Sequence, residues 1–169
     1  WHLWWTDGTS AATIMHPAVV SRFTDTAPKV LGVVGDSVVI AGSSNPGDGE
    51  VASVLLVNRN APLSPEVAAS ISADAFQLSS TRIGGVRVGD RLVFAGTTPE
   101  TGTEPWVTNG TALGTQMLID AYPGPANSIN PGSSTSRPFG LTHDGKSVMY
   151  SYIPGSPSLL ITDGTPQGT

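Results

Sequence analysis

The feature that most constrains the fold of this chain is a seven-residue phrase that recurs along it. The phrase reads LWWTDGT at 3–9, PWVTNGT at 105–111 and LLITDGT at 159–165, with a degenerate copy, LLVNRNA, at 55–61. The copies of its fourth position are Thr6, Asn58, Thr108 and Thr162, which are 52, 50 and 54 residues apart. Such a period is the signature of a repeat architecture, in which each unit buries its apolar face against the next. The positions that define the motif are Trp4, Thr6, Asp7, Gly8, Thr9, Trp106, Thr108, Asn109, Gly110, Thr111, Leu160, Thr162, Asp163, Gly164 and Thr165.

A second phrase keeps the same period and predicts hairpins. The segments 31–42, 85–96 and 139–150 each place a Gly-Asp or Asp-Gly pair between two apolar runs. That pattern is a strong short-range signal for two antiparallel strands joined by a tight turn. A further strand is expected after each Thr-Asp-Gly-Thr turn, most clearly at 115–120.

Four strands in about 50 residues is typical of a propeller blade. We therefore predict an all-β, β-propeller-like array of about three four-stranded antiparallel blades. Residues 1–169 form one segment, with repeats at approximately 10–61, 62–111 and 112–165. Because closed propellers have roughly four to eight blades, the chain is expected to be an excerpt of a larger propeller. The variable segments 62–80 and 121–137 are interpreted as surface loops, with a helical turn considered at 65–70.

The composition excludes several classes of protein. Only 12% of the residues are charged, the formal net charge is −5, and the eight basic residues are scattered singly, so no basic stripe is available to contact nucleic acid. The chain has no cysteine, which removes disulfides and thiol chemistry. No apolar run approaches the length of roughly 18 residues that a membrane span needs.

The copy at 104–115, EPWVTNGTALGT, resembles the bacterial ELWxxDGT repeat, often described as hyalin-like. The resemblance extends over nearly the whole chain, and it implies propellers in large, secreted or surface-attached proteins. It therefore implies an extracellular, cell-surface or periplasmic location and carries no activity. Two departures stand out: the copy at 55–61 has lost the Thr-Asp-Gly-Thr turn, and Pro105 replaces the usual Leu. Because proline cannot donate to a ladder, Pro105 is expected on an edge strand.

The aromatic residues favour packing over ligand binding. Trp4, Leu56, Trp106 and Leu160 share one motif position, and a position that accepts Trp or Leu is expected to pack between blades. Trp1 and Trp5 lack such equivalents. They form an exposed aromatic patch or are covered by other chain, and the sequence leaves both alternatives open.

Candidate metal ligands are sparse. Asp7, Asn109 and Asp163 offer one side-chain oxygen donor group per turn, whereas calcium takes six to eight converging oxygens. The loop 45–50, NPGDGE, is rich in oxygens but lacks the regular spacing of a calcium loop. We expect solvated turns, no metal and no cofactor, with calcium as the alternative. Asn109 also begins a glycosylation sequon, which the turn motif explains by itself.

No catalytic constellation is recognised. The three histidines, His2, His16 and His143, occupy different repeat positions, and no nucleophile elbow or zinc-protease motif is present. The recurring aspartates at 36, 90 and 144 lie in the predicted hairpin turns, where Asp bonds locally.

The sequence accordingly favours a non-catalytic exported bacterial repeat protein that acts as a structural, adhesion or protein- and ligand-interaction module. Its expected partners are another protein or the remaining blades of the same chain. One alternative is an accessory subunit of a larger surface or membrane-associated complex. Another is a propeller enzyme domain acting on glycans or lactones, in which His and Asp side chains from different repeats would converge.

Overall fold

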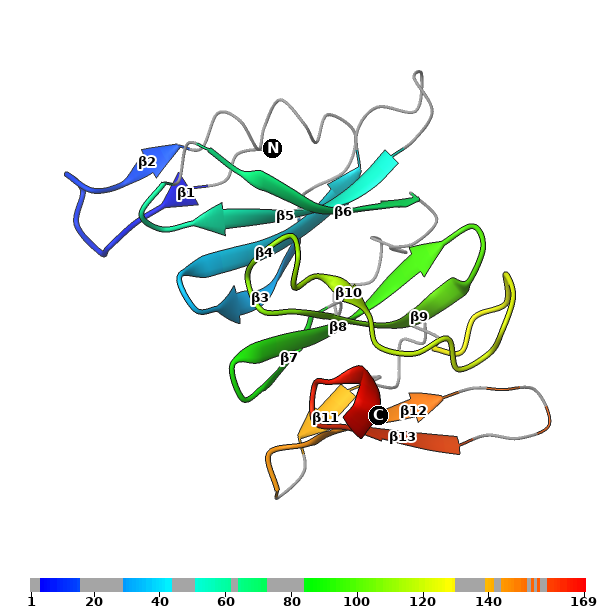
Figure 1. The fold of residues 1–169 in the computed structure, drawn as a ribbon. Helices are drawn as coiled ribbons and strands as arrows, with labels where there is room; N and C mark the ends of the chain where they lie inside the picture. Colours follow the sequence, from blue (N-terminus) through cyan, green and yellow to red (C-terminus); the bar gives the residue numbers. More distant parts are fainter. Residues whose placement is uncertain are drawn as a thin grey trace.

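A computed structural model of the chain describes residues 4–15, 29–43, 51–61, 64–72, 84–129, 139–141, 144–151, 153, 155 and 158–169. These residues form four antiparallel sheets (Figure 1). Sheet I holds β1 (Trp4–Trp5) and β2 (Ile14–Met15), and sheet II holds β3 (Lys29–Val34), β4 (Ser37–Ser43), β5 (Val51–Asn58) and β6 (Glu66–Ser72). Sheet III holds β7 (Val86–Val88), β8 (Arg91–Thr98), β9 (Gly102–Thr108) and β10 (Gln116–Met117). Sheet IV holds β11 (Phe139–Leu141), β12 (Ser147–Ser151) and β13 (Ser158–Thr162), followed by the 3₁₀ turn η3 (Pro166–Gly168).

The three predicted hairpins are confirmed. They are the antiparallel pairs β3–β4, β7–β8 and β11–β12. Gly35 and Gly89 adopt φ of 55° and 59° at the first two turns, which is the left-handed conformation that a tight hairpin turn requires. The prediction of an all-β chain with antiparallel sheets therefore holds.

In sheets I, II and III the strand after the turn pairs back onto the strand before it. In sheet III, Gln116 and Met117 of β10 lie opposite Val107 and Trp106 of β9. In sheet II, β6 likewise pairs with β5. Sheets I, II and III thus each contain the strands on both sides of a turn, whereas sheet IV contains β13, the strand before its turn. The predicted boundary between 61 and 62 falls inside sheet II.

Sheets II, III and IV stack face to face. One apolar core fills the space between sheets II and III, and a second fills the space between sheets III and IV. The central strand β8 contributes to both, because Leu92 and Phe94 point to one side and Val93 and Ala95 to the other. This alternation follows from the two-residue period of a strand. In Figure 1 the three sheets follow one another from top to bottom, with sheet I beside sheet II.

Two expectations from the sequence are wrong. Residues 66–72 form the strand β6 rather than a loop or a helical turn. Pro105 lies on β9, which pairs with both β8 and β10 and is therefore not an edge strand. The proline is accommodated because the ladder to β10 ends at Met117, and beyond it Pro105 serves only as an acceptor, taking a 2.8 Å hydrogen bond from the Leu118 amide.

The segment after β10 also differs from the surface loop that was predicted. Ser128 and Ile129 are fully buried, and Ile129 belongs to the core between sheets III and IV. The amides of both residues donate to the Thr103 carbonyl at the start of β9. Residues 128–129 of this segment are consequently buried within the stack.

Among the residues that the structure describes, Phe94 is the largest side chain that is completely buried. Its replacement by alanine leaves a cavity between sheets II and III, and we expect Phe94→Ala to lower the free energy of unfolding by about 3–5 kcal/mol. Urea denaturation measures the loss. Leu113→Ala is the control, because Leu113 is 99% exposed, and its effect should stay within about 0.5 kcal/mol. Equal effects of the two variants would contradict the stack.

Candidate functional site

The recurring turn is built by a dense set of local hydrogen bonds. At 108–115, Asn109 Oδ1 accepts from the Thr111 amide at 3.1 Å and from the Thr111 hydroxyl at 2.8 Å. The Gly110 amide donates to Thr108 Oγ1, and the Gly114 amide donates to Thr111 Oγ1, both at 3.0 Å. The Thr115 hydroxyl lies 2.7 Å from that of Thr108 and ties the end of the turn to its beginning. Each Thr and Asx side chain thus replaces a backbone partner.

The turns at 6–13 and 162–169 contain the same bonds. Asp7 accepts from both groups of Thr9, and Asp163 accepts from both groups of Thr165. The closing hydroxyl pair is Thr6 with Thr13 in one turn and Thr162 with Thr169 in the other. The hydrogen bonds from the Thr9 hydroxyl and amide hold the pKa of Asp7 below its usual value, and those from Thr165 do the same for Asp163. The carboxylates are therefore engaged inside their turns.

The degenerate copy is displaced by one residue from its alignment in the sequence. The Asn60 amide donates to Asn58 Oδ1 at 2.8 Å, as the Thr111 amide does to Asn109. The strand register agrees. Val38 and Leu92 each lie two residues after the hairpin aspartate, and they pair with Val57 and Thr108, respectively. Leu55, rather than Leu56, consequently takes the place of Trp106 in this copy.

Two of the turns are seated on the preceding sheet. The carbonyl of Gly110 accepts from Ser37 Oγ at 3.2 Å, and the carbonyl of Gly164 accepts from Arg91 Nη1 at 2.7 Å. Ser37 and Arg91 are the first residues of the second hairpin strands in sheets II and III. In both contacts the partners are 73 residues apart. The same joint thus fastens sheet III to sheet II and sheet IV to sheet III.

The shared aromatic position lies at different depths in its three intact copies. Trp106 packs into the core between sheets II and III, and Leu160 packs into the core between sheets III and IV. Trp4, in sheet I, is 58% exposed. Packing between sheets is therefore observed for Trp106 and Leu160. Trp1 lies outside the described residues.

Glu104 is a buried carboxylate that the sequence did not single out. It is fully buried on β9, where Oε2 accepts from the Ala121 amide at 2.9 Å and from the Ser128 hydroxyl at 2.6 Å, and Oε1 accepts from the Ser128 amide at 3.1 Å. Burial raises the pKa of Glu104, and the nearby Asp120 carboxylate adds to the rise. Because both oxygens are engaged by donors, Glu104 fastens the segment after β10 to sheet III. No signal beyond a Glu in the resembling motif pointed to it.

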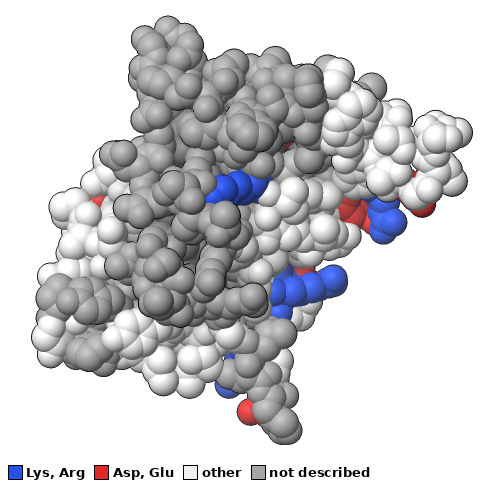
Figure 2. All heavy atoms as spheres, turned by 180° about the vertical axis from the view of Figure 1, so that it is seen from behind, with Lys and Arg blue, Asp and Glu red and all other residues white. Residues whose placement is uncertain are grey.

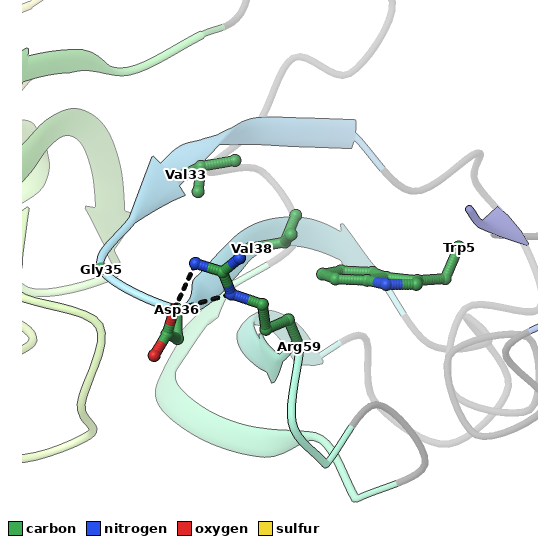
Figure 3. Close-up of a pocket in the computed structure, with 6 residues that line it drawn as sticks. All are labelled: Trp5, Val33, Gly35, Asp36, Val38 and Arg59. Atoms are coloured by element: carbon green, nitrogen blue, oxygen red, sulfur yellow. Dashed lines mark hydrogen bonds and ion pairs between the residues drawn. The ribbon is translucent and has the colours of Figure 1, made fainter. Parts of the chain in front are cut away.

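An open pocket of about 210 Å³ lies where sheet I meets sheet II (Figure 3). Trp5, from β1, faces Val38 and the stem of Arg59 across it. Arg59 Nη2 lies 2.6 Å from Asp36 Oδ1, and both side chains are about half exposed or more. An ion pair this accessible to water contributes little, about 0–1 kcal/mol. The pocket offers one aromatic face and one neutralised cation. Trp5 is partly covered there, and Trp1, the other residue of the aromatic patch considered from the sequence, lies outside the described residues.

The remaining candidates do not assemble into a reactive site in the described part of the chain. Among those residues, no group of three or more His, Asp or Glu side chains could hold a metal ion. The histidines at 2, 16 and 143 and the loop 45–50 lie outside the described residues. Figure 2 shows the charged side chains on the rear face as separate spots. No described helix is long and apolar enough to cross a membrane.

Comparison with known proteins adds no assignment. No family model matches the chain, no curated protein matches it, and no solved structure matches it.

The lowered pKa of Asp163 predicts an acid-dependent contribution to stability. A carboxyl whose pKa is depressed by folding stabilises the folded state above its unfolded pKa, and this contribution is lost as the pH falls through the folded pKa. Asp163→Asn keeps the accepting oxygen, as Asn109 shows, but does not titrate. We therefore expect the native chain to exceed Asp163→Asn in urea midpoint near about pH 7 and to converge with it near about pH 2. Asp163→Ala, which lacks the acceptor, should remain below both throughout. A constant gap between the native chain and Asp163→Asn would refute the assignment.

The close contact between the turn at 108–115 and sheet II predicts that substitution of Gly110 lowers stability. Gly110 has φ of 90°, and an added Cβ would lie 3.1 Å from the Val34 carbonyl oxygen of sheet II. Gly124 has φ of 104° with nothing within 4 Å of such a Cβ. Gly124→Ala should therefore cost only the backbone strain, roughly 1–2 kcal/mol, and Gly110→Ala about 1 kcal/mol more, as measured by urea denaturation. Indistinguishable losses would show that the turn is not closely seated.

Proposed function

We propose that this chain is a non-catalytic, exported bacterial repeat module of the β-propeller type, which acts as a structural, adhesion or protein-interaction element. The observation that supports it most is the repeated joint, in which a glycine carbonyl of one turn is held by the first residue of a hairpin strand in the preceding sheet. A module that adds sheets by one joint extends its surface without a dedicated reaction centre. The resemblance to the ELWxxDGT repeat supports an extracellular, cell-surface or periplasmic location.

The side chains of the motif support a structural role for the turn. Asp7, Asn109 and Asp163 each direct one oxygen at a threonine two residues on. An oxygen occupied by two donors is a poor ligand for a hard cation, which needs several converging oxygens. The motif therefore serves as a rigid joint, and we propose no cofactor for it.

A second candidate is an accessory subunit of a larger surface complex. It is favoured by apolar side chains at the end of the stack, where Leu159 is 65% exposed and Ile161 is 51% exposed. Exposed apolar faces of this kind mark contact surfaces in soluble proteins. Both candidates use the chain as a binding element, and they differ only in whether the partner is permanent.

Photocrosslinking in the cells that make the protein tests the proposal. A benzoylphenylalanine placed at Leu159 should form protein adducts, because that position lies on the exposed sheet face. The same group at Leu113, which is 99% exposed on the turn at 108–115 of sheet III, should form few or none. Hydrolysis of a glycan or lactone by the purified chain that disappears on Asp36→Asn or Asp90→Asn would overturn the proposal in favour of an enzyme.

A further inference from the structure

Sheet IV exposes an apolar face at one end of the stack. Tyr150 lies opposite Leu159 on neighbouring strands, and Val148 lies opposite Ile161, so that the four side chains share one face. Tyr150, Leu159 and Ile161 are 48%, 65% and 51% exposed. The alternate residues, Met149 and Leu160, point the other way into the core with sheet III.

The corresponding face of sheet III is covered by another sheet. In sheet III, the cross-strand pair Val93–Val107 adjoins the pair Leu92–Thr108. In sheet IV, the pair Val148–Ile161 adjoins the pair Ser147–Thr162 in the same way. The pairs Val93–Val107 and Val148–Ile161 are therefore equivalent. Val93 and Val107 are buried by sheet IV. The exposed face of sheet IV is therefore a surface of the kind that receives a sheet elsewhere in the same molecule.

The opposite end of the molecule presents the matching kind of face. Trp106 and Leu160 are the residues with which sheets III and IV insert into the sheet before them. Trp4 holds the same place in the motif, lies opposite Met15, and both are exposed, by 58% and 42%. In Figure 1 sheet I lies beside sheet II at the upper end of the stack, and sheet IV forms the lower end.

We propose that the exposed face of β12–β13 binds the β1–β2 face of a second copy of this chain, head to tail. This inference rests on the proposed function in one respect, namely that the end faces are used for contact. The two faces continue an interface that the chain already forms twice, with an aromatic or leucine side chain of one sheet set against the apolar pairs of the sheet before it. Because the two ends differ, the contact is heterologous and each bound copy keeps one free end.

The turn of sheet I fits the same geometry. Added Cβ atoms on Gly110 and Gly164 would contact the preceding sheet, whereas one on Gly8 has no neighbour within 4 Å. In sheet IV, Ser147 pairs with Thr162 as Leu92 pairs with Thr108 in sheet III. Lys146 and Arg91 come immediately before Ser147 and Leu92, so Lys146 holds the position of Arg91. In the proposed contact, Lys146 of one copy lies against the Gly8 carbonyl of the next, which repeats the joint between Arg91 and Gly164.

Sedimentation of the purified chain over a range of concentrations tests the contact. The native chain should show assemblies that grow with concentration beyond a dimer. Trp4→Asp and Ile161→Asp each place an unpaired charge in one of the two faces and should each weaken self-association at least about tenfold. Leu113→Asp adds the same charge at an exposed site outside both faces and should sediment as the native chain does.

A mixture of the two face variants gives the sharpest result. Trp4→Asp keeps an intact sheet IV face and Ile161→Asp keeps an intact sheet I face, so an equal mixture should form one-to-one dimers that grow no further. Such recovery also shows that both variants are folded. A native chain that stays monomeric, or variants that associate as it does, would overturn the inference. Association lost through Ile161→Asp alone would overturn it too, because it would indicate a symmetric contact between two sheet IV faces.

The two proposals fail in different ways. A monomeric chain whose Leu159 position still crosslinks to a different protein in cells would end the inference and leave the proposed function standing. Catalytic turnover that depends on a hairpin aspartate would end the proposed function, whatever the chain does in the centrifuge.

Discussion

The burial of apolar side chains on both faces of sheet III is the interaction on which the rest of the structure depends. Leu92 and Phe94 reach one core and Val93 and Ala95 the other, so that a single strand, β8, supplies both. A shift of the strand register by one residue moves every side chain to the other face of the sheet. In a sheet with two buried faces, such a shift only exchanges one apolar set for the other, so burial alone does not select the register. The register must therefore be held by something more specific than burial, and the hydrogen-bonded turns at the strand ends provide it.

Those turns combine two functions in a few residues. The Asx and threonine side chains satisfy the backbone within the turn, while the glycine carbonyl remains available to the neighbouring sheet. Because glycine has no side chain, the turn can approach the neighbouring sheet closely, and Gly110 lies against Val34. Where the motif has degenerated, at Asn58, the Asx bond persists but Arg59 replaces the glycine, and its side chain pairs with Asp36 instead.

The sequence predicted the features that depend on local chemistry. The hairpins followed from Gly-Asp between apolar runs, and the turn from Asp and Gly at fixed offsets. Strand β6 was missed because its Ala and Ser residues carry little of the β-branched signal that marks a strand. The inner position of Pro105 was missed because it depends on where β10 ends, and the role of Glu104 because its three donors lie 17 and 24 residues away. The shift of the degenerate copy became visible only through the Asn60–Asn58 hydrogen bond and the strand pairing.

The joint between sheets also has a direction in time. In both observed cases the receiving residue, Ser37 or Arg91, precedes the glycine that it holds, Gly110 or Gly164, by 73 residues. The hairpin strand that receives each turn is therefore synthesised well before the turn itself. A hairpin that folds as it emerges would offer each new turn its place, so that the chain could fold from its amino-terminal side, sheet by sheet, as domains tend to do during synthesis.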